Sequence, residues 1–364
     1  MPEPALAHLT IDLDALAHNY GVIRAEAVGA EVAPVVKANG YGLGAVELAR
    51  RLWAEGARSF FVARTAEGTA LRAGLGPERP ATIYVLDGLT VGAGPVLLAD
   101  NLTPVLTSLP QVTEASALAR ALGRALPVGL HVDTGMNRQG VTPDEARALA
   151  QSVDRLRGLD LQLVMSHLGS APEPDNPRNR QQLERFVDIR GLFPDARASL
   201  AASAGSFLGP DFRFDLVRPG VSLYGGGPLE TPDPRLRAVA IFTAPILDIR
   251  NVQAGELIGY GGNVRVDRPT RVAMVAAGYA DGVIRAGRGE GYAWYAGARR
   301  TLLISNMDLL AIDIGDAPAH VGDAVELLGP NAPLDDFATA AGTVAHEVLV
   351  RLSPRAGRTY VGKA

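Results

Sequence analysis

Two apolar patterns alternate over residues 33–217. Short runs rich in β-branched residues predict strands buried on both faces, and apolar residues three and four positions apart predict helices between them. The predicted strands are 33–37, 60–63, 82–86, 103–107, 127–132, 161–165, 198–201 and 214–217. The predicted helices are 45–53, 66–73, 94–100, 111–122, 143–153 and 178–192, and the last two gaps are shorter and less clear.

A strand at 8–11 and a helix precede this series. Leu16, Tyr20 and Ile23 form the apolar stripe of the helix, and either Asp12 or Asp14 can cap it. Eight buried strands separated by helices predict a (β/α)8 barrel. A doubly wound sheet is the competing layout, but it usually has fewer strands and a phosphate-binding fingerprint, which Gly-Tyr-Gly-Leu-Gly at 40–44 does not complete.

The pattern changes after Pro228. A linker-like Thr-Pro-Asp-Pro cluster at 231–234 leads into strand-like runs alone, bounded by Gly, Asp and Asn turns. These runs are 238–249, 256–259, 270–276, 292–294, 301–305, 309–314 and 324–328. We expect an all-β second domain, built as a small barrel or a Greek-key sheet. The predicted fold is therefore α/β: a TIM-like barrel over 1–235, followed by a mainly-β domain over 236–364, with the strand at about 6–11 free to pair with the second domain.

Composition narrows the functional classes. The 364 residues are 47% hydrophobic and 20% charged, as in a soluble globular protein, and no apolar run is long enough to span a membrane. A net charge of −4 without a basic block disfavours nucleic acid as a partner. The absence of cysteine excludes disulfides, a thiol nucleophile and a cysteine metal site. We expect a cytoplasmic protein, because the first residues lack the pattern of a signal peptide.

Candidate chemistry gathers where barrel strands end, because these ends face the active site of a barrel. A lysine buried at such an end has a lowered pKa and can form a Schiff base, and the glycine turn after it can approach an anion. Neither a carboxylate pair suited to glycoside hydrolysis nor metal-ligand spacing occurs there, so no metal is expected. The strand-end residues are Lys37 with Tyr41, Arg138, His167, Ser203, and Arg218 followed by Gly220 and Val221.

Structural interpretations remain open for each of these residues. Lys37 could extend its amine to solvent, and His167 could be a core histidine bonded to backbone. Ser203 could be only a helix cap. In the second domain, Tyr279 could be a strand residue beside a hairpin turn or a general base, and spacing does not choose between these roles.

Five spaced motifs and the C-terminal tail resemble the ordered motif set of alanine racemase. The resemblance extends from about residue 5 to the end of the chain. The motifs are Val-Lys-Ala-Asn-Gly-Tyr-Gly-Leu-Gly at 36–44, Val-Asp-Thr-Gly-Met-Asn-Arg-Gln-Gly at 132–140, Val-Arg-Pro-Gly-Val-Ser-Leu-Tyr-Gly at 217–225, Gly-Tyr-Ala-Asp-Gly at 278–282 and Met-Asp at 307–308, with Leu-Ser-Pro-Arg-Ala-Gly-Arg-Thr-Tyr at 352–360.

The resemblance implies a pyridoxal 5'-phosphate enzyme that interconverts L- and D-alanine and supplies D-alanine for peptidoglycan. It implies a head-to-tail homodimer with shared active sites and a small amino acid as substrate. Lys37 would hold the cofactor covalently and act as one base, and Tyr279 of the partner subunit would be the base on the opposite face. Inversion needs proton removal on one face and delivery on the other, hence two bases.

The same resemblance implies roles for the other motif residues. Arg138 would bind the phenolic oxygen of the cofactor and, with Met307 and Asp308, the substrate side. Arg218 would donate to the pyridine nitrogen, leaving it unprotonated and suppressing transamination. A protonated His167 would bridge Arg218 and the tyrosine base. The phosphate ligands would be Tyr41, Ser203, Gly220, Val221 and Tyr360.

The chain departs from the family pattern at several positions. His131 stands where many members have a lysine, often carbamylated, so no carbamate is predicted here. Leu43 replaces a usual histidine, Ala202 a usual asparagine, and Asn39-Gly40 a usual Asp-Ala. These changes bear on substrate range more than on reaction type.

Other activities fit the same fold. A serine or broad-specificity amino-acid racemase is the main alternative. A decarboxylase of this architecture needs an acidic partner at the pyridine nitrogen and a cysteine near the substrate, so Arg218 and the absence of cysteine disfavour it. A non-catalytic pyridoxal-phosphate carrier would be a bare barrel, and the second domain with Tyr279 disfavours that interpretation.

Overall fold

The computed structural model describes residues 6–152, 154–262 and 264–363. The chain folds into two compact units. One is Tyr20–Leu223, and the other is Tyr224–Ala364 together with the segment before Tyr20. Of the predicted helix 143–153, residue 153 lies outside the described residues.

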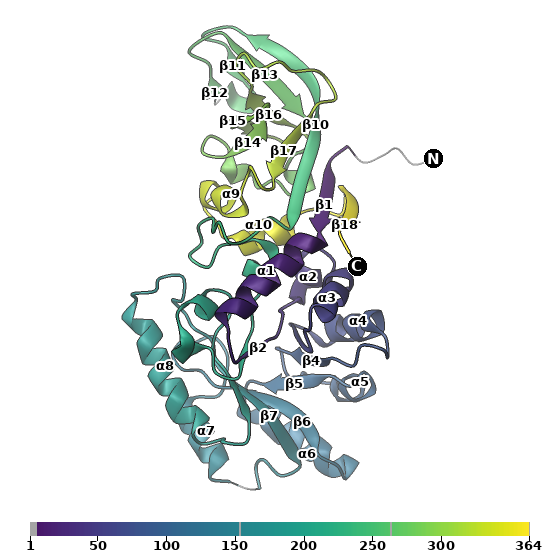
Figure 1. The fold of residues 1–364 in the computed structure, drawn as a ribbon, viewed down its shortest axis with the longest axis vertical. Coiled ribbons are helices and arrows are strands. Elements are labelled where there is room, and N and C mark those ends of the chain that lie inside the picture. Colours follow the sequence, from purple (N-terminus) through teal and green to yellow (C-terminus); the bar gives the residue numbers. More distant parts are fainter. Residues whose placement is uncertain (1–5, 153, 263, 364) are drawn as a thin grey trace. The chain divides into compact units, whose positions relative to one another are not determined.

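Eight parallel strands close into a barrel in the first unit (Figure 1). Strands β3 to β8 pair in chain order, and β2 pairs with β9. Bridges between Val35 and Phe61 and between Ala202 and Arg218 join these two sets, which confirms the predicted barrel. The strands are β2 (Glu31–Val32), β3 (Ser59–Val62), β4 (Thr82–Val85), β5 (Thr103–Leu106), β6 (Leu126–His131), β7 (Leu159–Met165), β8 (Arg197–Ser199) and β9 (Leu216–Val217).

Helices follow most of these strands. They are α3 (Ala45–Ala54), α4 (Thr65–Leu75), α5 (Gly94–Ala99), α6 (Leu109–Leu122), α7 (Pro143–Ala150) and α8 (Pro177–Arg190). The last two gaps hold only short 3-10 turns, η1 (Ala204–Phe207), η2 (Pro210–Phe212) and η3 (Val221–Tyr224). Helix α1 (Leu13–Glu26) begins at Asp12, whose Oδ1 accepts the N–H groups of Asp14 and Ala15 at 2.9 Å. Asp12 is therefore the cap of this helix.

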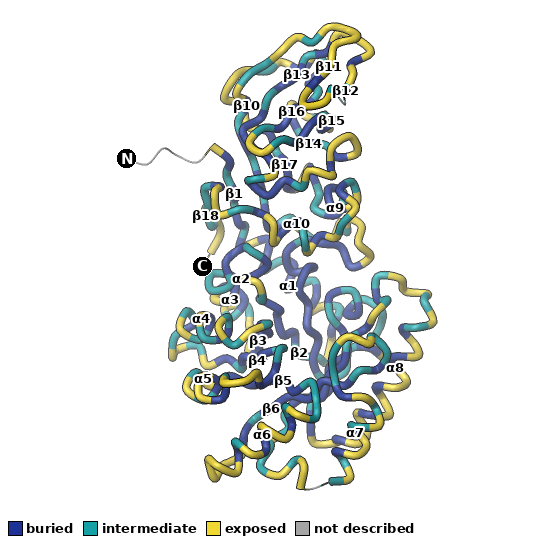
Figure 2. Tube along the Cα trace, turned by 180° about the vertical axis from the view of Figure 1, so that it is seen from behind, coloured by how far each residue is buried: buried dark blue, intermediate teal, exposed yellow. Residues whose placement is uncertain are grey.

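The barrel core lies within the strands. Every residue of β3 and β5 is buried, as expected for strands covered on both faces. Figure 2 shows this buried trace, with exposed residues on the outer helices α6, α7 and α8. Phe61 and Tyr84 stack across β3 and β4 with their ring centroids 4.7 Å apart, a pair that adds about 0.5–1.5 kcal/mol beyond its buried area.

The second unit is built on one long sheet in the order β13-β16-β15-β14-β17-β10-β1-β18. Strand β10 also pairs with β13, so six of these strands form a closed ring. An irregularity between Ile246 and Asp248 lets the long β10 pair with both β17 and β13. The strands are β1 (His8–Asp12), β10 (Ala240–Val252), β13 (Thr270–Val275), β14 (Tyr292–Tyr295), β15 (Ala298–Ser305), β16 (Leu310–Asp313), β17 (Ala324–Leu328) and β18 (Gly357–Val361), with a separate hairpin of β11 (Leu257–Ile258) and β12 (Val264–Arg265).

Strand β1 lies between segments distant in the sequence. It pairs antiparallel with β10, where Leu9 is opposite Phe242, and parallel with β18, where Ile11 is opposite Tyr360. Leu9, Ile11 and Phe242 are fully buried. The N-terminal strand thus contributes to the core of the second unit.

Two expectations were wrong. The second unit is not all-β, because it contains helices α9 (Leu334–Ala340) and α10 (Ala345–Arg351). Each has only seven residues, too few to show a clear helical period. The first barrel strand also ends before Lys37, which instead begins the turn α2 (Lys37–Tyr41). Among the described residues, no helix is long and apolar enough to cross a membrane.

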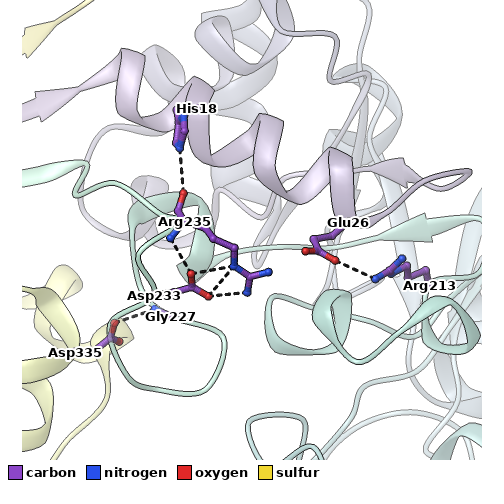
Figure 3. A network of polar contacts seen from close by, with 7 residues as sticks. All are labelled: His18, Glu26, Arg213, Gly227, Asp233, Arg235 and Asp335. Atoms are coloured by element: carbon purple, nitrogen blue, oxygen red, sulfur yellow. Dashed lines mark hydrogen bonds and ion pairs between the residues drawn. The ribbon is translucent and has the colours of Figure 1, made fainter.

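The predicted linker at 231–234 is fastened within the second unit, as Figure 3 shows. Arg235 pairs with Asp233 at 2.7 Å, and its carbonyl oxygen lies 3.0 Å from the His18 ring nitrogen. The Gly227 N–H donates to Asp335 at 2.9 Å. Asp335 is 3% exposed, and burial raises its pKa from 3.8 to about 6.

The raised pKa of Asp335 predicts a pH dependence of stability. Its contribution is fully present below pH 3.8, where the carboxyl is protonated in both states, and is lost as pH rises through about 6. Asp335→Asn keeps an acceptor for Gly227 without ionising. We expect its thermal midpoint to exceed that of the wild type at pH 7 and the gap to close at pH 4. The exposed Asp316→Asn should show no such change; an equal gap for Asp335→Asn at both pH values would contradict the prediction.

Candidate active site

Lys37 opens a left-handed turn at the barrel rim. The φ angles of Ala38, Asn39, Gly40, Tyr41 and Gly42 are 52°, 54°, 63°, 55° and 83°. Left-handed backbone costs about 1–2 kcal/mol for each non-glycine residue, and such strain persists only where the surroundings impose it. Strain of this kind concentrates at functional sites.

Close packing and a helix cap impose this turn. A Cβ on Gly40 would overlap Leu48 Cδ1 and press on the Ala45 nitrogen, and the φ of Gly40 is positive, so glycine is favoured there. Asn39 Oδ1 accepts the Ala45 N–H at 3.0 Å, which caps α3. Leu43, one of the departures from the family pattern, is fully buried. The turn is therefore held from the α3 side.

The Lys37 amine is largely buried near one cation and two carboxylates. Burial lowers its pKa most, Arg138 lowers it further, and Glu67 and Asp87 oppose the shift. A lowered pKa raises the fraction of neutral amine, which is the nucleophilic form. The environment of Lys37 thus suits Schiff-base chemistry.

Tyr41, Ser203 and Gly220 come together beside the Lys37 turn. A Cβ on Gly220 would overlap the Tyr41 hydroxyl oxygen. Burial raises the pKa of Tyr41, so its hydroxyl stays a donor. Ser203 Oγ accepts the N–H groups of Gly220 at 2.9 Å and Ser222 at 3.2 Å. The Ser222 hydroxyl is buried without a hydrogen-bond partner among the described residues. The hydroxyl groups of Tyr41, Ser203 and Ser222 thus gather in one place, and hydroxyl donors suit an anion.

Arg218 is a buried cation, 3% exposed. It donates to the carbonyl oxygen of Ser166 at 2.6 Å, to that of Leu200 at 3.4 Å, and to Ser199 Oγ. Within the described ranges no carboxylate lies within ion-pair distance of it. Burial lowers its pKa to about 9, so it remains charged at neutral pH. A buried charge supported only by neutral acceptors is typical of a functional site.

The two rim histidines are neutral. Burial, then Arg218 and Arg138, lower the pKa of His131 to about 4. The same causes, in the same order, hold the pKa of His167 well below its ordinary value. The expected protonated His167 is therefore wrong in this structure, because burial disfavours the charged imidazole and the cations beside it repel a further proton.

A tight loop carries Arg138. Asp133 Oδ1 accepts the N–H groups of Gly135 and Met136, each at 2.8 Å, and Val132 bridges to Val141 to close the loop. Arg138 is exposed at the tip, yet its charge acts on Lys37, His131 and His167. The structure thus brings Lys37, Arg138, His167 and Arg218 to one rim, as predicted from strand ends.

Gln182 of α8 is a rim support that the sequence did not indicate. Its Nε2 donates to the His167 carbonyl oxygen at 3.0 Å, and its Oε1 accepts the Gly169 N–H at 2.8 Å. Its neighbour Thr134 lies 2.7 Å, Oγ1 to Oγ, from Ser166, which in turn accepts from Arg218. Gln182 is 1% exposed on the face that also buries Leu183. A polar residue on an apolar helical face was the available signal.

The second unit presents its own candidate residues. Tyr279 begins the 3-10 turn η5 (Tyr279–Asp281), and its N–H donates to Asn306 at 3.0 Å. The Ala280 N–H donates to Met307 at 3.0 Å, which places the Tyr279 turn beside Met307 and Asp308. Tyr279 and Met307 are 44% and 54% exposed. Tyr360 lies in β18.

Comparisons with known proteins identify the family. Residues 11–228 match the model of the N-terminal domain of alanine racemase, and residues 239–360 match that of its C-terminal domain. The chain belongs to the alanine racemase family. This confirms the family, the fold class, the isomerase activity and the pyridoxal 5'-phosphate cofactor predicted from the motifs.

Relatives resemble the chain over nearly its whole length. The catabolic alanine racemase of Mesorhizobium japonicum is 44% identical, over 98% of this chain and 93% of its own. The biosynthetic enzyme of Agrobacterium fabrum is 41% identical, over 99% and 95%. A crystal structure of alanine racemase from Bartonella henselae with covalently bound pyridoxal phosphate has a TM-score of 0.92, at 34% identity and covering 98% of this chain and all of that one.

The residues present fit pyridoxal phosphate. The donors around Tyr41, Ser203 and Gly220 suit a phosphate, and the orphaned Ser222 hydroxyl adds a polar group beside them. Arg218 has no carboxylate to neutralise it within the described part of the chain and so keeps a charged donor for a ring nitrogen. The Lys37 amine at the same rim supplies a Schiff-base partner.

The contact of Tyr41 with Gly220 predicts a steric test. Gly220→Ala should displace the Tyr41 hydroxyl and weaken pyridoxal-phosphate binding, measured from the visible absorbance during titration of the cofactor-free protein. Tyr41→Phe in the Gly220→Ala background should recover part of that loss, because it removes the atom that clashes first. Strictly additive losses in the double variant would argue against the contact.

Proposed function

We propose that this alanine racemase inverts alanine through two bases, Lys37 and Tyr279 of the partner subunit. One observation carries the assignment of Lys37. The sequence contains only two lysines, Lys37 and Lys363. Lys363 follows β18 near the end of the chain, whereas Lys37 lies at the barrel rim beside Arg138. A covalently held pyridoxal phosphate therefore has one lysine suited to it.

The bound cofactor acidifies the substrate Cα–H by delocalising negative charge into its ring. The Lys37 amine, with its lowered pKa, accepts or returns that proton on one face. Tyr279 does so on the other face when its hydroxyl is ionised. Arg218, charged at neutral pH, favours the ionised form of a nearby tyrosine.

Arg218 would also donate to the ring nitrogen of a bound pyridoxal phosphate and so keep that nitrogen unprotonated, which would favour racemisation over transamination. Neutral His167 connects Arg218 with Tyr279, since a neutral imidazole has one donor and one acceptor nitrogen. Arg138 binds the phenolic oxygen and the substrate side. The proposed phosphate ligands are Tyr41, Ser203, Gly220, Val221 and Tyr360.

The exposed block around Tyr279 supports a shared active site. Backbone hydrogen bonds from Tyr279 to Asn306 and from Ala280 to Met307 fix the two turns against each other, yet Tyr279 and Met307 are each roughly half exposed in the single chain. Exposed apolar residues that gather in one patch mark interaction sites, and we infer that Tyr279 and Met307 belong to such a patch. We propose a head-to-tail homodimer in which Tyr279, Met307 and Asp308 complete the partner subunit's site.

Four finer points stay predictions. The relatives include enzymes named catabolic and biosynthetic, so supply of D-alanine for peptidoglycan is one of two physiological directions open to this racemase. A serine or broad-specificity racemase is the alternative substrate range, which D/L conversion of alanine, serine and lysine would test. The cytoplasmic location and the domain boundary at 235/236 stand as the sequence predicts them.

The two lysines give a matched test. Lys37→Ala should abolish both the visible absorbance of bound cofactor and alanine racemisation, because no other rim amine can replace it. Lys363→Ala should retain both. Racemisation that survives in Lys37→Ala, measured by a D-alanine assay, would overturn the proposed function.

A second test concerns the partner's base. Tyr279→Phe should slow proton abstraction from L-alanine much more than from D-alanine, measured as the α-deuterium exchange rate of each enantiomer. Mixing Lys37→Ala with Tyr279→Phe should create dimers with one intact shared site, about a quarter of wild-type activity after random exchange of subunits. Mixtures as inactive as their parents would contradict the shared site.

A further inference from the structure

Glu67, in the first turn of α4, contacts the Lys37 turn through its side-chain carboxylate. Glu67 Oε1 accepts the Ala38 N–H at 2.8 Å. Its Oε2 accepts the N–H groups of Ala63 at 2.8 Å and Arg64 at 3.2 Å. One side chain thus ties the residue after Lys37 to the segment that follows β3.

We propose that Glu67 is a positioning residue for Lys37, which fastens the left-handed turn to the end of β3 and supplies the negative charge facing the Lys37 amine. The proposal rests on the proposed function, in which Lys37 carries the cofactor. Glu67 was not among the residues indicated by the motifs.

Only a carboxylate satisfies this geometry. Three backbone N–H groups point at its two oxygens, and an amide side chain has a single acceptor oxygen. The Ala38 N–H is the first donor of the left-handed run, where φ turns positive. Holding this donor fixes the backbone next to Lys37. Without it, the turn would relax out of its strained left-handed conformation.

The charges around Lys37 show why the carboxylate matters electrostatically. Burial and Arg138 favour the neutral amine, and Glu67, followed by Asp87, favours the charged one. His167 also lies within range of the Lys37 charge. Glu67 is thus the main counter-charge to Arg138, and it keeps the amine able to hold a proton as well as release it.

The presence of two lysines allows a direct measurement. Full-length protein labelled with ε-¹³C-lysine, freed of cofactor with hydroxylamine, gives one signal for Lys37 and one for Lys363, the internal reference. We expect Glu67→Gln to lower the pKa of Lys37, seen as a titration shifted to lower pH. We also expect faster hydrogen exchange at the Ala38 amide, because its acceptor is weakened.

Glu145→Gln is the matched control. Glu145 holds the same third position of a helix, α7, and its carboxylate accepts the Thr142 N–H at 2.7 Å in a capping box. Its loss removes an equivalent cap and charge without touching the Lys37 turn. A Lys37 titration that is the same in Glu67→Gln as in Glu145→Gln would overturn the proposal, whatever the activity of either variant.

If Glu67→Gln does not fold, Glu67→Asp tests the same proposal. It keeps the charge but withdraws one methylene, so Lys37 should titrate near its wild-type pH while the Ala38 amide exchanges faster. A hydrogen-exchange rate at the Ala38 amide equal to that of the wild type would contradict the proposal that Glu67 fastens the Lys37 turn. Neither measurement depends on racemisation. A negative result for the role of Glu67 is therefore distinct from a negative result for the assignment of Lys37, which Lys37→Ala tests.

Discussion

The buried charge of Arg218 governs the rest of the barrel rim. It is 3% exposed and held by neutral acceptors, Ser166, Ser199 and Leu200. Burial lowers the pKa of His131 and His167 most, and the charges of Arg218 and then Arg138 lower it further, which explains why both histidines are neutral. In the proposed mechanism the same charge would serve a ring nitrogen and an ionised tyrosine. Burial and the two arginines together therefore set the protonation states of the rim histidines.

Backbone strain in the turn after Lys37 is the second feature on which the site depends. The left-handed turn after Lys37 includes non-glycine residues that would not adopt it alone. Asn39 holds it from α3, and Glu67 holds it from α4. Because the two supports come from helices on the barrel wall, the position of the Lys37 amine depends on the barrel being folded. The cationic rim and the rigid turn thus act on the same amine, one through its pKa and the other through its location.

The sequence predicted what depends on local pattern and missed what depends on contacts across the fold. Strands such as β3 and β5 consist mostly of apolar residues, so their burial could be predicted from the sequence. The predicted strand ends then indicated that Lys37 and Arg218 lie on one rim. The short helix α9 carries no clear period and was missed. Gln182 was missed because its partners lie on loops after other strands. The charge of His167 was mispredicted because it depends on burial and on two distant arginines together.

The departure at His131 now has a physical meaning. A carbamylated lysine would place a negative charge beside Arg138, whereas neutral His131 places none. The orientation of Arg138 in this chain instead depends on its loop, which is closed by the Val132–Val141 bridge and by the Asp133 carboxylate. Position 131 supplies no anion, and the positive charge of Arg138 contributes to the lowered pKa of Lys37, after burial. A negative charge from another part of the chain therefore has to oppose Arg138, and Glu67 is the carboxylate that raises the pKa of Lys37 most.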